Sequence, residues 1–367
     1  RKLADGKMSR LYVAEALMTQ TGANADHRLR AKPSSTMAAA VYVAKQLGVT
    51  VDGEADGLTA KQQKWLAGCA ADLRDNEGKG LVVAGYRQPE AVHLLVHQIN
   101  DVLKNNGATV VFMPAEKSHG TLQDLKDDLG QVDHIINLGC NPFYDAPADL
   151  NWAEAAAGKT KFRLADHASD ESSEKSGITA PRAHYLESWG DARTSDGTYV
   201  PVQPLIAPLF GAMNELEVLA VFANPKSPRT AHEVVQSTFA KNFPGESWQH
   251  FLHAGFQKDS AAKPVENLQL AAADGSCEAP PASGGDELEV VFTRDYSVDD
   301  GRFANNGWCQ ELPDPITKIT WDNVMSVSRT TAEELGLKNG NVAKLTLGVD
   351  ELSVEGPVWV QPGMADD

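Results

Sequence analysis

Residues 80–113 read GLVVAGYRQPEAVHLLVHQINDVLKNNGATVVFM, and this stretch decides the fold class. It opens with a short apolar run that ends at Gly85, and Pro89 then suits the first turn of a helix. Apolar residues recur at helical spacing through residues 90–105, and a second apolar run follows at 108–113. We therefore predict strand, helix and strand in succession, which indicates a parallel sheet covered on both faces.

The rest of the chain extends this pattern and then changes it. Before the linker, strands are predicted at residues 9–15, 134–138 and 160–164, and helices at 37–47, 60–75, 121–130, 215–223 and 231–240. After the linker, strands are predicted at 288–293, 316–321, 342–347 and 358–361, with one helix at 331–335. The predicted fold class is α/β, with parallel-sheet domains followed by a small β-rich, barrel-like domain.

The change of pattern sets the predicted domain limits. Residues 271–287 are small, polar and rich in glycine and proline, which is typical of a linker. We expect residues 1–35 to end one α/β domain, 36–270 to form a central α/β domain, and 288–367 to form a truncated β-rich domain. The chain opens Arg-Lys and has its first methionine at position 8, so we expect a piece of a longer protein.

Composition excludes several classes of function. The formal net charge is −17, so the basic surface that nucleic acid requires is missing. No window approaches the ~20 apolar residues that a membrane-spanning helix needs, so no direct membrane span is expected. The four cysteines (69, 140, 277 and 309) are far apart, unlike the ligands of an iron–sulfur cluster.

Residues 184–208, HYLESWGDARTSDGTYVPVQPLIAP, interrupt the regular elements. Prolines at 201, 204 and 208 exclude a helix, so we predict a long irregular segment whose apolar content argues against disorder. Glu187 in this segment is either a general acid or a residue that holds the loop to backbone donors.

Three further residues are candidates for contact with a cofactor. Gly139 and Asn141 follow a predicted parallel strand, where ligands bind in open sheets, although an Asn-Pro step is also a common simple turn. Asn323 lies beside a tryptophan, a pair that can flank a flat cofactor or pack at a domain seam. His93 and His97 have the spacing of zinc ligands, but no third ligand is evident, so we predict no metal site.

Five stretches together resemble the molybdopterin oxidoreductase superfamily, in the same order along the chain. They are residues 9–30, 80–111, 132–150, 184–208 and 305–326. The resemblance is greatest to the large iron–sulfur subunit of alternative complex III, a bacterial quinol:electron-acceptor oxidoreductase. Where many active members carry Gly-Arg, this chain has Gly197-Thr198, so a clamp for a pterin diphosphate is missing.

The resemblance implies a role inside a membrane-associated, quinol-oxidising complex of the respiratory chain. It implies the periplasmic side of a bacterial cytoplasmic membrane, other complex subunits as partners, and iron–sulfur clusters elsewhere in the full-length subunit. It implies no catalytic residue and no cofactor in this piece, with Gly139, Asn141, Glu187 and Asn323 framing a vestigial cofactor cleft. Two alternatives stay open: an active molybdenum bis-pterin oxidoreductase, and a redox-inactive α/β binding module.

Overall fold

The computed structural model describes residues 8–115, 120–266, 268–271, 288–347 and 352–366. The chain forms two compact units: residues 1–111 with 267–367 (unit 1), and residues 112–266 (unit 2). Each unit is described by itself. The domain limits given above stay a prediction, and apart from residue 271 the predicted linker at 271–287 lies outside the described residues, as does Cys277.

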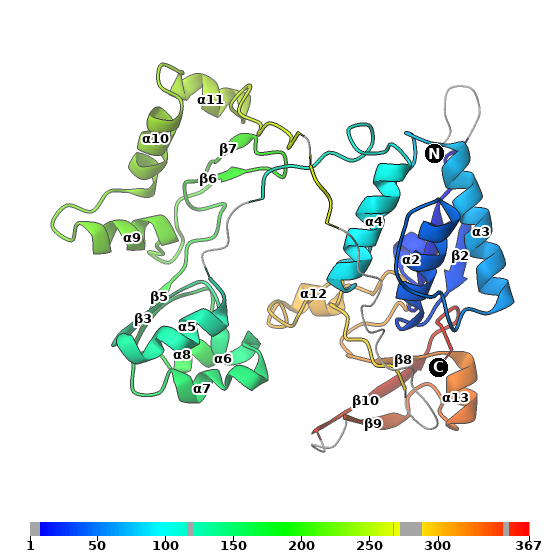
Figure 1. The fold of residues 1–367 in the computed structure, drawn as a ribbon. Helices are drawn as coiled ribbons and strands as arrows, with labels where there is room; N and C mark the ends of the chain where they lie inside the picture. Colours follow the sequence, from blue (N-terminus) through cyan, green and yellow to red (C-terminus); the bar gives the residue numbers. More distant parts are fainter. Residues whose placement is uncertain (1–7, 116–119, 267, 272–287, 348–351, 367) are drawn as a thin grey trace. The chain divides into compact units, whose positions relative to one another are not determined.

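Three helices form the core of unit 1 (Figure 1). They are α2 (Ser35–Gln46), α3 (Ala60–Asp75) and α4 (Glu90–Val102), all close to the predicted ranges. The side chain of Thr59 caps α3 by accepting from the Gln62 N–H, and that of Gln62 accepts from the Thr59 N–H in return. Helix α2 packs against both α3 and α4, and Val41, Leu95 and Ile99 are no more than 1% exposed.

The predicted strands at residues 80–85 and 108–113 are not strands in the structure. In the first of these segments a side chain takes the place of a neighbouring strand: Asn100 of α4 donates to the Val82 carbonyl (2.8 Å) and accepts from the Val82 N–H (3.0 Å). This amide satisfies the backbone that a neighbouring strand would have paired. Among the described residues, the N-terminal part of unit 1 has a parallel sheet of two strands, β1 (Tyr12–Glu15) and β2 (His27–Arg30), with the short α1 (Gln20–Ala23) between them.

The C-terminal part of unit 1 is a small mixed sheet of order β8–β10–β9. Its elements are β8 (Met325–Val327), α13 (Arg329–Glu334), β9 (Val342–Leu347) and β10 (Leu352–Val360), preceded by α12 (Gly307–Glu311). The strands predicted at 288–293 and 316–321 are not formed. Residues 314–319 instead fold back through Asp314, whose carboxylate accepts from the N–H groups of Ile316 (2.9 Å) and Thr317 (2.6 Å).

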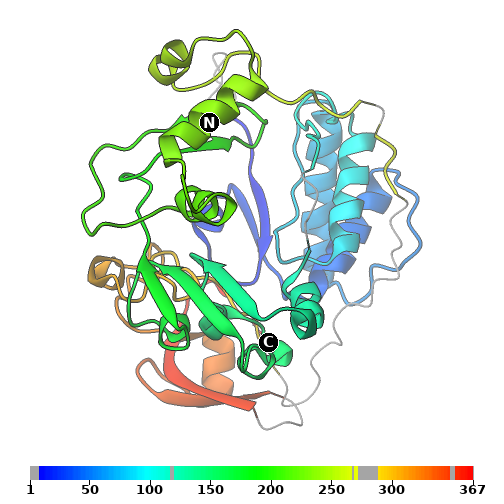
Figure 2. The same cartoon turned by 90° about the vertical axis from the view of Figure 1, so that its left-hand side faces the viewer.

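Unit 2 is built on a three-stranded parallel sheet of order β3–β4–β5 (Figure 2). The strands are β3 (His134–Leu138), β4 (Thr160–Ala165) and β5 (Ile178–Pro181). One face is covered by α5 (Leu122–Asp128), α6 (Pro142–Asp145) and α7 (Trp152–Ala155), with the short helices η1 (Leu129–Gln131) and η2 (Ala148–Leu150) and with α8 (Glu171–Glu174) in the same region. On the other face Ile136, Phe162 and Ile178 lie in register, and both isoleucines remain exposed.

The segment at 184–208 is less irregular than predicted. It contains an antiparallel hairpin of β6 (Gly190–Arg193) and β7 (Tyr199–Val202), with Pro201 inside a strand. A two-stranded sheet has only edge strands, and an edge strand tolerates the missing N–H of proline. Helices α9 (Glu215–Ala223), α10 (Ala231–Asn242) and α11 (Trp248–Ala254) follow. Tyr199 packs with Phe239 and Phe251 in a buried aromatic cluster.

Candidate functional site

Gly139 closes the carboxyl end of β3, where the sequence analysis places a candidate site. Its φ of +82° lies in the left-handed region that glycine adopts freely. Its N–H donates to the Leu164 carbonyl (3.0 Å), which extends the β3–β4 ladder by one residue. A Cβ at this position would lie 3.0 Å from Cζ of Arg182, so the guanidinium group occupies the space beside the glycine.

Asn141 ties the loop after β3 to the start of α8. Its side-chain amide donates to Glu171 (3.0 Å), and its oxygen accepts from the N–H of Ser172 (3.1 Å). The bond from Asn141 holds the pKa of Glu171 below its usual value. Gly139 and Asn141 thus lie in one turn, as predicted, and Asn141 acts there as a link between two segments of the protein.

A buried arginine lies beneath this turn. Arg163 of β4 is 2% exposed and donates to the Cys140 carbonyl, to Oγ of Ser173 (3.0 Å) and to the carboxylate of Asp170. Burial raises the pKa of Asp170, but hydrogen bonds from Ser173 and the guanidinium group outweigh that effect and leave the pKa below its usual value. The cation is therefore neutralised and bonded inside the protein.

Arg182 is the second cation at this edge of the sheet. Its Nε atom lies 2.6 Å from Oε1 of Glu215, and its Nη1 atom lies 3.3 Å from Oδ2 of Asp166. Burial lowers the pKa of Arg182, but these two carboxylates outweigh that effect and raise it. Arg182 is about a third exposed, so its ion pairs are accessible to solvent.

The charges at this edge test whether a diphosphate group would fit. Two guanidinium groups (Arg163 and Arg182) face four carboxylates (Asp166, Asp170, Glu171 and Glu215), a balance of 2 − 4 = −2. A phosphate site needs bidentate arginines or free backbone N–H groups directed at the anion. The cations here are already paired, so the residues at this edge do not fit a diphosphate.

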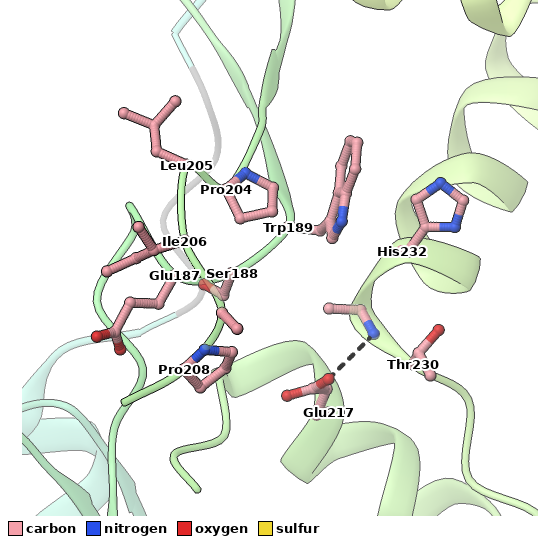
Figure 3. A pocket seen from close by; sticks show the side chains of 12 residues that line it. Glu187, Ser188, Trp189, Pro204, Leu205, Ile206, Pro208, Glu217, Thr230 and His232 are labelled. Atoms are coloured by element: carbon pink, nitrogen blue, oxygen red, sulfur yellow. Dashed lines mark hydrogen bonds between the residues drawn. The ribbon is translucent and has the colours of Figure 1, made fainter. Parts of the chain in front are cut away.

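Glu187 lies elsewhere in unit 2, at a hollow of about 460 Å³ (Figure 3). Its walls are the segment 187–189, residues 204–208, Glu217 of α9 and the start of α10 at residues 230–232. In Figure 3 the carboxylate of Glu187 points away from Trp189 and His232. It accepts from the His184 N–H (3.3 Å), which fits the predicted role of holding the loop.

Glu217 and its neighbour Asn214 are hydrogen-bonded to the segments that form the walls of the hollow. Glu217 accepts from the N–H groups of Asn214 (3.2 Å) and Ala231 (3.5 Å), so it joins the beginnings of α9 and α10. The Asn214 side chain also donates to the Trp189 carbonyl (2.8 Å). The Trp189 ring meets His232 edge to face, with centroids 4.7 Å apart.

Asn323 is exposed and belongs to unit 1, whereas the other three candidates belong to unit 2. Within the residues that the structure describes, no three histidine, cysteine or acidic side chains are grouped closely enough to bind a metal ion. Over the same residues no helix has the length and apolar character needed to cross a membrane.

Sequence reasoning missed Arg163 and Arg182, the two residues that organise the edge. A signal for Arg163 is present in the strand KFRLA, where a charged residue interrupts apolar neighbours at a position that faces the covered side. Arg182 follows β5 directly, but its carboxylate partners are 16 and 33 residues away in sequence. Such pairing depends on the tertiary fold.

Comparisons with known proteins give a structural likeness and no sequence match. No family model matches the chain, and no curated protein matches it by sequence. Among solved structures, acetylene hydratase from Pelobacter acetylenicus is similar, with a TM-score of 0.61 and 10% identity over 97% of this chain. The chain spans 65% of the length of that protein. At this identity the likeness concerns the fold alone: the chain is a mixed α/β protein with parallel sheets, and it shares this fold with acetylene hydratase over almost its whole length.

Proposed function

We propose that this chain is a non-catalytic, structural part of a molybdopterin-oxidoreductase-like subunit. In this proposal the fold of a cofactor-enclosing enzyme serves as scaffolding, and electrons pass through iron–sulfur clusters in other parts of the full-length subunit. The proposed setting is a quinol-oxidising respiratory complex of the alternative complex III type, on the periplasmic side of a bacterial membrane. The proposed partners are the other subunits of that complex.

One observation carries the proposal: the polar groups at the carboxyl edge of β3–β5 are bonded to one another. Arg163 and Arg182 are paired with carboxylates, and Asn141 links two loops. A pterin diphosphate would have to displace these partners, and the buried contact of Arg163 with Asp170 is strongly destabilising to break. The threonine at position 198, in place of arginine, agrees with this reading.

Metal and pterin analysis of the full-length protein tests the proposal directly. We expect molybdenum and tungsten far below one atom per chain by mass spectrometry, and no pterin fluorescence after oxidative release. About one metal atom and two pterins per chain would overturn the scaffold reading and establish the active enzyme instead.

Titration of this chain with inorganic pyrophosphate gives a sharper test of the edge itself. We expect no saturable binding by calorimetry in the wild-type chain. The double variant D166N/E215Q frees the Arg182 guanidinium and should bind pyrophosphate measurably, whereas E154Q, an exposed change on α7, should not. Micromolar binding by the wild-type chain would contradict the proposal.

A further inference from the structure

Residues 204–210 (PLIAPLF), here called the strap, expose a continuous run of large apolar side chains. Leu205 is 77% exposed, Phe210 is 81% exposed, and Ile206 and Leu209 are also exposed. Exposed patches of this kind mark interaction sites on soluble proteins. Scattered single apolar residues would carry no such meaning, but here four occur within six positions.

The strap is held in place by backbone contacts. The N–H groups of Leu205 (2.8 Å) and Ile206 (3.2 Å) both donate to the Leu186 carbonyl. This places Tyr185, 64% exposed, and Leu186 beside the strap, so the apolar patch comprises six side chains. Pro204 and Pro208 restrict the backbone further, so a partner would meet a surface that loses little conformational freedom on binding.

Carboxylates flank the strap. Glu187 and Glu217 line the same hollow as residues 204–208 of the strap. No lysine or arginine is among the described residues that line the hollow. The chain as a whole carries a net charge of −17. An apolar patch with an acidic border is complementary to an apolar surface with a basic border.

From these observations we propose that the strap, with Tyr185 and Leu186, is the docking surface for a partner protein segment that presents apolar side chains flanked by lysine or arginine. The inference rests on the proposed scaffold function and names the surface through which the scaffold contacts a neighbouring subunit. Trp189, whose ring lines the hollow beneath the strap, supplies an aromatic face for a basic side chain that enters it.

Model peptides serve as the probe because the partner is unidentified. An eight-residue labelled peptide of alternating leucine and lysine is titrated with the chain, and the signal is fluorescence anisotropy. Peptides with glutamine or glutamate in place of lysine are run in parallel. We expect the lysine peptide to bind most tightly and the glutamate peptide not to bind. Equal affinity for the lysine and glutamate peptides would overturn the inference.

Matched variants separate the strap from the general acidity of the protein. L205S/F210S removes two exposed apolar side chains and should weaken binding of the lysine peptide about tenfold or more. L219S/F256S changes the same two residue types outside the patch, where each side chain is about half exposed, and should alter the affinity less than about twofold. An unchanged affinity in L205S/F210S would contradict the proposal.

Two further measurements test the role of charge and the identity of the partner that binds at the strap. E187Q should weaken binding of the lysine peptide and leave binding of the glutamine peptide unchanged. If E187Q changed the two affinities equally, charge complementarity would be excluded. Analytical ultracentrifugation tests whether a second copy of this chain binds at the strap. A dimer that is present in the wild type and lost in L205S/F210S would overturn the proposal that the partner is a different protein. None of these results depends on the pyrophosphate or metal tests, which report on the edge of β3–β5.

Discussion

Arg163 shows how one residue can fix a loop, two strands and a short helix together. Its guanidinium group is bonded to Cys140, Ser173 and Asp170, and the Asp170 side chain is only 11% exposed. Substitution by methionine keeps about the same volume but leaves a largely buried carboxylate without its cation. Breaking such a pair is destabilising by about 3–5 kcal/mol.

We therefore expect R163M to lower the unfolding free energy of unit 2 by that amount. Hydrogen exchange of the β4 amides at increasing urea concentration measures it. The comparison variant is R329M, which breaks the exposed pair between Arg329 and Glu333 in unit 1; hydrogen exchange of the β9 and β10 amides should show that it changes the unfolding free energy of unit 1 by less than about 0.5 kcal/mol. If R163M and R329M lowered the unfolding free energy equally, the contacts of Arg163 would contribute no more than an ion pair on the surface.

Asp170 gives the same contact a pH dependence. Its folded-state pKa is lower than the value of about 3.9 expected in the unfolded chain. A lowered folded pKa stabilises the protein above the unfolded pKa, and this contribution is lost as pH falls through the folded pKa. The stability difference between the wild type and D170N should therefore narrow from pH 7 to pH 3, as measured by urea unfolding. A stability difference between the wild type and D170N that stays constant from pH 7 to pH 3 would show that this contact does not lower the pKa of Asp170.

The sequence predicted where the candidate turn lies but not what its side chains do. Gly139 and Asn141 could be placed at a strand end because strand and turn are local patterns. Their neighbours Arg182 and Glu171 come from other elements, so the pairing that occupies Asn141 and the space beside Gly139 could not be read from spacing. For Glu187, by contrast, the sequence also allowed the role that the structure shows, because its carboxylate accepts from the N–H of His184, only three residues away.

At the scale of elements, the side chain of Asn100 makes the backbone hydrogen bonds that a neighbouring strand would otherwise make with Val82. It is 1% exposed, bonds both backbone groups of Val82, and accepts from Nδ2 of Asn105 (3.0 Å). N100L would leave three polar groups without a partner, at about 1–3 kcal/mol for each that stays buried. We expect a loss of at least about 3 kcal/mol and faster hydrogen exchange at the Val82 amide.

The matched control for N100L is N76L, because the Asn76 amide makes an exposed bond to Asp72. It should cost less than about 1 kcal/mol. If N100L leaves exchange at Val82 unchanged, then the extended segment at 81–85 is held by something other than this amide.

The turn of the β6–β7 hairpin depends on Gly197. Its φ is +85°, and a Cβ there would lie 2.8 Å from the backbone nitrogen of Ala262. Gly245 has a similar φ of +90° but open space around it. G197A and G245A therefore share the backbone strain of about 1 kcal/mol, and only G197A adds a clash of about 1–3 kcal/mol. Thermal unfolding of the two variants should differ accordingly, whereas equal melting temperatures would mean that residues 260–262 can move aside.

Helices were predicted well because their periodicity and caps are local, as the match at Ala60–Asp75 illustrates. Strands were predicted less well. The runs at 80–85 and 108–113 have the composition of strands, but pairing requires a partner at the right distance, and Asn100 takes that place for Val82. Conversely, the prolines of residues 184–208 led to the prediction of an irregular segment where the structure has a hairpin. Each strand of a two-stranded sheet is an edge strand, and an edge strand tolerates a residue without a backbone N–H.

At the scale of the whole molecule, each unit has a hydrophobic core of its own. Unit 1 is packed around α2, α3 and α4, whereas unit 2 has one core beneath β3 and an aromatic one around Phe239. Chains with separate cores commonly depart from two-state unfolding. We therefore expect two transitions in urea, resolved by hydrogen exchange of amides from each unit.

R163M and N100L can assign each unfolding transition to one of the two units. R163M should move only the transition of unit 2, and N100L only that of unit 1, because each buried contact lies wholly within one unit. The double variant should show both shifts with additive free energies, within about 0.5 kcal/mol. A single transition that either substitution moves for the entire chain would mean that the two units unfold as one. The stability of the scaffold would then be a property of the whole chain, and a partner bound at the strap would stabilise unit 1 as well as unit 2.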